Sequence, residues 1–228
     1  MASLALTALN QAWGRFLTGL SVGTLLYLFF DMMHEAMELT GVRDILPWTI
    51  LLGSLFVSFV GLATIEERRQ TNTSDTTPLF LPFMIALGMG LHNLGEGLAF
   101  GASYAQGQWA LSSLLVGGFA LHNGTEGFGI MGAVDRTPLS LNDIVLLGLL
   151  AGGPTCFGTV ISGYGVSPYL SITFYTLAAG SLLYVIVSLI ALSYTTGRRL
   201  HTAMGIFVGI GLMYTTGMIL SLLIGAKA

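Results

Sequence analysis

Two short segments of the chain repeat one arrangement of ionisable side chains. One reads HNLGEG and begins at His92, and the other reads HNGTEG and begins at His122. In each, a glutamate, Glu96 or Glu126, follows the histidine by four positions. Positions i and i+4 lie on one face of an α-helix, about one turn apart. An imidazole nitrogen and a carboxylate oxygen on one face can bind a divalent cation such as zinc, so two such helices predict a closed metal site.

An asparagine directly follows each histidine, at Asn93 and Asn123. Each amide lies ~100° further round its helix than the histidine, which is enough to face a second cation beside the first. Two neighbouring metal positions bridged by Glu96 and Glu126 are compatible with this spacing. Hydrogen bonds between helices explain the asparagines equally well.

The composition places these segments in a membrane protein. Of 228 residues, 54% are hydrophobic and only 8% are charged, against about 25% charged residues in an ordinary soluble domain. The net charge of −3 gives no basic surface for nucleic acid. The single cysteine, Cys156, excludes an internal disulfide framework. The N-terminal residues lack the basic region of a signal peptide.

Seven stretches contain the roughly 20 mostly apolar residues that a spanning helix needs. They cover residues 14–39, 45–65, 79–104, 109–133, 141–164, 168–194 and 201–224. The only joint long and polar enough to be a linker lies at 66–78. We therefore expect an all-α, polytopic membrane helix bundle with about seven transmembrane helices, forming one domain over residues 1–228.

The basic residues predict the orientation of this bundle. Six of the eight fall on the side of the N-terminus, namely Arg15, Arg68, Arg69, Arg136, Arg198 and Arg199, and two fall on the other side, Arg43 and Lys227. Because cytoplasmic loops are enriched in Lys and Arg, the N-terminus is expected in the cytoplasm and the C-terminus outside.

The repeated segments both fall near the middle of their predicted spans. The connection between these spans, near Gly107, is short, so the two helices should be antiparallel neighbours with both motifs at one depth. An ionisable residue inside a spanning helix costs at least ~2.5 kcal/mol on insertion scales, and generally belongs to an ion or proton path. A dication between two carboxylates compensates their charge. The alternative for one histidine–glutamate pair is a hydrogen bond between helices, and duplication makes that alternative weaker.

A second group of polar residues lies near the outer end of the first span. Asp31, His34, Glu35 and Glu38 occupy two turns of the expected helix. On the predicted topology they face the outside, where they could collect cations and deliver them to the central site. Asp31 is the strongest pathway candidate because it lies deepest. Solvated polar residues at a helix end explain the group equally well.

The paired motif resembles the HNxPEG-type signatures of the ZIP (Zrt-, Irt-like) family of divalent metal transporters. Three other segments are similar to parts of that family: GTLLYLFFDMMHEAME at 23–38 to its second helix, PTCFG at 154–158 to its sixth and AAGSLLYV at 178–185 to its seventh. In that family the paired motifs lie on the fourth and fifth of eight helices and form a binuclear metal site. The first of the eight helices has no counterpart here.

The resemblance implies two metal positions. The first uses the two histidines and both glutamates, and the second uses Asn93, Asn123 and the same glutamates. The chain departs from the family at three residues: Gly95 and Thr125 replace the motif's proline, and Gly153 stands where the sixth helix usually carries a glutamate. The last departure predicts a weaker second position.

Together these features predict a multi-pass transporter of the plasma membrane. It would move Zn²⁺, or a similar dication such as Fe²⁺, Mn²⁺ or Cd²⁺, down its gradient into the cytoplasm, the direction that the resemblance implies. We expect no enzymatic activity; the expected partners are the dication and the lipid bilayer, and a homodimer is compatible with the sequence. The rivals are an intramembrane metal-dependent hydrolase that activates water with the same residues, and a structural protein without transport activity.

Overall fold

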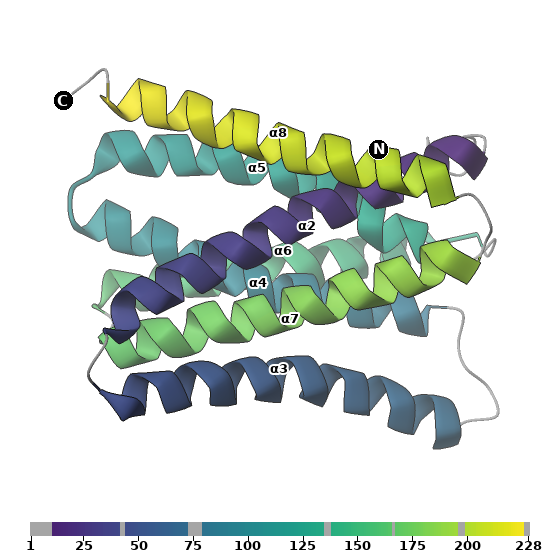
Figure 1. The fold of residues 1–228 in the computed structure, drawn as a ribbon, viewed down its shortest axis with the longest axis horizontal. Coiled ribbons are helices and arrows are strands. Elements are labelled where there is room, and N and C mark those ends of the chain that lie inside the picture. The colour runs from purple at the N-terminus through teal and green to yellow at the C-terminus, as the bar shows by residue number, and fades with distance from the viewer. Residues whose placement is uncertain are drawn as a thin grey trace.

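The computed structural model describes residues 11–41, 44–72, 79–134, 138–165, 167–195 and 199–225. Within these ranges the chain forms seven α-helices and no strands (Figure 1). The helices are α2 (Gln11–Thr40), α3 (Ile45–Asn72), α4 (Phe80–Ala105), α5 (Trp109–Gly132), α6 (Leu141–Gly163), α7 (Pro168–Thr195) and α8 (Arg199–Gly225). The expected all-α bundle is therefore confirmed.

Several helix boundaries coincide with glycine or proline residues. Gly41 ends α2 and Gly107 lies between α4 and α5, with φ of 63° and 73°, a backbone conformation that favours glycine. Pro168 is the first residue of α7, where its missing N–H leaves no hydrogen bond unmade. The largest departure is α3, which continues through the polar sequence EERRQTN to Asn72 rather than ending at residue 65.

Five helices are long and apolar enough to cross a membrane, namely α2, α3, α6, α7 and α8, within the ranges that the structure describes. The chain thus has the helices of a multi-pass membrane protein. The two other helices, α4 and α5, have 26 and 24 residues and carry the polar motifs. Four basic residues used for the predicted orientation, Arg43, Arg136, Arg198 and Lys227, lie outside the described residues.

Glycines bring two pairs of helices into backbone contact. A Cβ atom added at Gly19 or Gly23 of α2 would meet backbone atoms of Thr202 or Ile206 in α8, and one added at Gly205 would meet Phe16. Contacts therefore advance in the same direction along both helices, so α2 and α8 are parallel neighbours. Small residues on such faces let membrane helices approach closely.

The pair α4 and α6 is joined in the same way. A Cβ atom at Gly90 or Gly97 of α4 would meet backbone atoms of Leu150 or Thr155 in α6. A Cβ atom at Gly158 of α6 would in turn meet the Leu94 carbonyl oxygen. Because α4 also packs against α7 and α5, the middle of α4 is enclosed on several sides.

Replacing Gly205 with Ala should destabilise the bundle, because the new methyl group would overlap the α2 backbone. Overpacking of this kind costs about 1–3 kcal/mol. Gly211→Ala in the same helix is the matched control, since no atom lies within 4 Å of a Cβ atom there. Thermal unfolding in detergent, followed by tryptophan fluorescence, should show a lower midpoint for Gly205→Ala than for Gly211→Ala. Equal midpoints would contradict the close α2–α8 contact.

Candidate metal centre

The two motifs meet in the middle of an antiparallel hairpin. Helix α4 leads through Gln106–Gln108 into α5, and the two helices pack against each other (Figure 1). The prediction of antiparallel neighbours with motifs at one depth is confirmed, because side chains of the two motifs touch directly. Both helices are continuous across their motifs, so glycine or threonine in place of the family's proline introduces no break.

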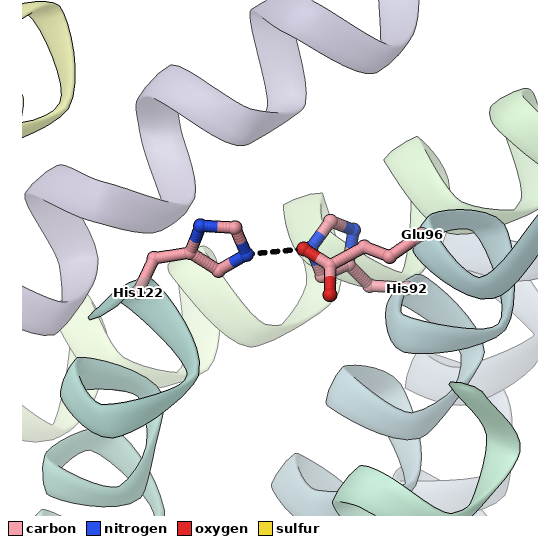
Figure 2. Close-up of side chains that lie close together, drawn as sticks. All are labelled: His92, Glu96 and His122. Carbon is pink, nitrogen blue, oxygen red and sulfur yellow. Dashed lines mark hydrogen bonds and ion pairs between the residues drawn. The ribbon is translucent and has the colours of Figure 1, made fainter. Parts of the chain in front are cut away.

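The two imidazoles converge on one carboxylate oxygen. His92 Nε2 lies 3.2 Å from Glu96 Oε1, and His122 Nε2 contacts the same oxygen from α5 (Figure 2). His92 Nε2 also lies 3.7 Å from Glu126 Oε1. Two ligands of one zinc ion, each ~2.1 Å from it, lie at most ~4.2 Å apart. The two distances from His92 Nε2 lie within that limit.

The asparagines connect each motif to the glutamate of the other. Asn93 Nδ2 donates to Glu126 Oε2 over 3.3 Å, and Asn123 Nδ2 donates to Glu96 Oε2 over 3.4 Å. The duplicated sequence thus forms a pseudo-symmetric arrangement across the hairpin. Asn93 Nδ2 also donates to the Ala151 carbonyl oxygen in α6 over 3.0 Å, and this hydrogen bond breaks the symmetry.

The cluster is deeply buried and contains two acidic side chains. His92 and Glu96 are fully buried, Glu126 is 3% exposed and His122 is 4% exposed. Neither glutamate pairs with a lysine or arginine of the described chain; their ion-pair partners there are the two histidines. With neutral imidazoles and both carboxylates ionised, the cluster would hold a formal charge of −2. A buried charge needs a counter-charge or a metal ion, and one dication balances this cluster.

Several acceptor atoms of the cluster have no hydrogen-bond partner. They are Glu126 Oε1 and the amide oxygens of Asn93 and Asn123, all shielded from solvent. Buried polar atoms normally have partners, and exceptions point to a ligand, ion or water. The interhelical hydrogen bonds use the amide nitrogen of each asparagine, and they leave these oxygens without a partner. The donor set therefore fits a cation better than a purely structural network.

The expected role of position 153 is wrong. Gly153 lies one turn from Leu149 and one turn from Phe157, which are 65% and 69% exposed. A Cβ atom at Gly153 would have no atom within 4 Å. By helix geometry, a glutamate there would point away from α4 rather than toward the centre. The absence of that glutamate is therefore no argument for a weak second metal position.

Two contacts of the centre carry no signal in the sequence. The Ala151 carbonyl oxygen reaches Asn93 through the main chain, so no polar residue identifies α6 as part of the site. Thr125 Oγ1 donates to the His122 carbonyl oxygen over 2.7 Å. Such hydrogen bonds to the preceding turn often bend helices slightly.

The structure places the four polar residues of α2 in different surroundings. Asp31 and His34 line a pocket between α2 and α8, whereas Glu35 and Glu38 do not. His34 Nε2 lies 3.3 Å from Glu38 Oε1, with both side chains largely exposed. Of the four residues, Asp31 is the one that places a carboxylate in this pocket.

No protein-family model matches this chain, and no curated protein matches it either. The fold and the site define its class by themselves: a multi-pass helical membrane protein with a buried anionic cluster of histidine, glutamate and asparagine.

Replacing Glu96 with Gln should weaken zinc binding strongly, because the oxygen that both imidazoles contact would lose its charge. Removing even an outer-shell partner of a metal lowers affinity about 10–100-fold, and a direct ligand should matter at least as much. Zinc affinity of the purified protein can be measured by competition with a chromophoric chelator. Glu67→Gln, at the exposed end of α3, is the matched control. Unchanged affinity in Glu96→Gln would remove Glu96 from the site.

Proposed function

We propose that the protein transports zinc or a similar divalent cation across the membrane through the centre formed by α4 and α5. The observation that supports this most directly is the buried pair of carboxylates, contacted by two imidazoles and by no lysine or arginine of the described chain. Imidazole and carboxylate together suit zinc and its neighbours among the divalent metals. The similarity of the paired motif to ZIP transporters supports the same proposal.

The position of the centre favours transport over a structural role. A structural zinc site normally closes itself with four protein ligands, many of them cysteines, whereas Cys156 is exposed and no cysteine belongs to this cluster. An intramembrane ionisable group is by default part of a path for ions. The cation must also leave again, and binding that is favourable but not extreme permits this.

We further propose entry from the outside and release into the cytoplasm. Asp31, the one carboxylate lining the pocket between α2 and α8, would attract the hydrated cation on the entry side. Conduction along this route requires that α4 and α5 cross the membrane with the other five helices.

The rival function is hydrolysis inside the membrane. His92, Glu96 and His122 offer three ligand atoms within 4.8 Å of one another, and catalytic zinc sites commonly combine three protein ligands with an open position for water. Zinc-dependent cleavage of a membrane-embedded peptide by the purified protein, without zinc flux, would favour this function over transport.

The proposed function is tested by zinc uptake into proteoliposomes loaded with a fluorescent zinc indicator. Wild-type protein should carry zinc down its gradient, and Glu126→Gln should reduce the initial rate at least about tenfold, because the dication loses half of its counter-charge in a low-dielectric setting. Glu67→Gln should match the wild type. Normal uptake by Glu126→Gln would contradict the proposed route, and no uptake by correctly folded wild type would contradict transport.

The proposed orientation has its own test. A tag at residue 1 should react only from the cytoplasm and a tag at residue 228 only from outside, because seven spans place the termini on opposite sides and the arginines favour an inner N-terminus. Accessibility of both tags can be measured in intact and permeabilised cells. Both tags on one side would mean that an even number of helices crosses the membrane.

A further inference from the structure

Helices α2 and α8 flank an open pocket of about 380 Å³. The glycine contacts described above hold the two helices together near Gly19 and Gly23. Beyond that point the helices separate toward Thr40 and Gly225 (Figure 1), and the pocket lies where they separate.

Aromatic rings form much of the pocket lining. The lining includes Tyr27 and Phe30 of α2 and Tyr214 of α8, and two further side chains are aliphatic. The rings of Tyr27 and Tyr214 have centroids 5.0 Å apart and planes at 83°, so they make a corner. Phe30 and Tyr214 are 67% and 66% exposed, which leaves ring surface available to a ligand. Aromatic faces attract organic cations, and quaternary ammonium groups are bound in proteins by cages of this kind.

One carboxylate supplies charge to this lining. Asp31 and His34 are its two charged or ionisable members apart from the tyrosines, and none of its seven residues is lysine or arginine. His34 is already paired with Glu38 outside the pocket. A dication stripped of water needs several oxygen ligands, which one carboxylate among aromatic and aliphatic walls does not provide. A monovalent organic cation requires one counter-charge and apolar or aromatic contact for its alkyl groups, and the pocket offers both.

We propose that the pocket between α2 and α8 binds an organic ammonium group, held by the Asp31 carboxylate and the rings of Tyr27 and Tyr214. The ammonium could belong to a small soluble amine or to the headgroup of a lipid, since both present the same cation. The site uses residues of α2 and α8, whereas the metal centre is built on α4 and α5.

Binding of tetramethylammonium to the full-length protein in maltoside micelles, measured by calorimetry, tests the proposal. Wild type should bind one equivalent saturably. Asp31→Asn should weaken binding about tenfold, Tyr214→Leu about fivefold, and Tyr214→Phe, which keeps the ring, by no more than about twofold. Asp44→Asn, an exposed acid before α3, is the matched control and should bind as wild type does.

Nanodiscs separate the two sources of the ammonium group. If phosphatidylcholine lowers the apparent affinity for tetramethylammonium relative to phosphatidylglycerol alone, lipid headgroups compete for the site; equal affinities assign the site to soluble amines. Wild-type binding that does not saturate, or equal binding by Asp31→Asn, would overturn the proposal. Glu126→Gln should retain tetramethylammonium binding, so the pocket can be tested even if the proposed metal transport fails.

Discussion

The need to accommodate two carboxylates inside an apolar bundle determines much of this structure. Glu96 and Glu126 are almost completely buried, and the described chain offers them imidazoles and amides but no basic side chain. Removing an unpaired carboxylate from water would be prohibitive in a low-dielectric interior. The amide donors of Asn93 and Asn123 offset part of this penalty. The remaining charge is what makes the centre suited to a dication.

The polar centre depends on the close helix packing that the glycines allow. Gly97 lies one residue beyond Glu96, and it lets the α6 backbone approach α4 at the level of the motif. A larger residue would separate these helices and move the Ala151 carbonyl oxygen away from Asn93. Close backbone packing therefore keeps the site enclosed, and enclosure in turn strengthens every electrostatic contact within it. The same residue type joins α2 to α8, where helix separation further along opens the ammonium pocket.

Sequence patterns predicted the helices and the central residues because both rest on local rules. Hydropathy located the seven helices of the described ranges, and the i to i+4 spacing placed His92 and Glu96 on one face, as the structure confirms. Position 153 was assigned wrongly because the alignment of a short motif does not determine which face of α6 meets α4. That face depends on where Gly90, Gly97 and Gly158 allow backbone contact, which is a tertiary property. The aromatic pocket escaped prediction for the same reason, since Tyr27 and Tyr214 are 187 positions apart in the chain and meet only through the α2–α8 crossing.

The hydrogen bond from Asn93 to the Ala151 carbonyl oxygen has a consequence for genetics. The acceptor is a main-chain atom, so any residue type at position 151 that preserves the helix provides it. A screen for loss-of-function alleles would then recover the polar residues of α4 and α5 and pass over position 151, although its carbonyl oxygen holds one of the asparagines in place. Comparison of related sequences would likewise record no polar side chain there, although the molecule has a polar contact.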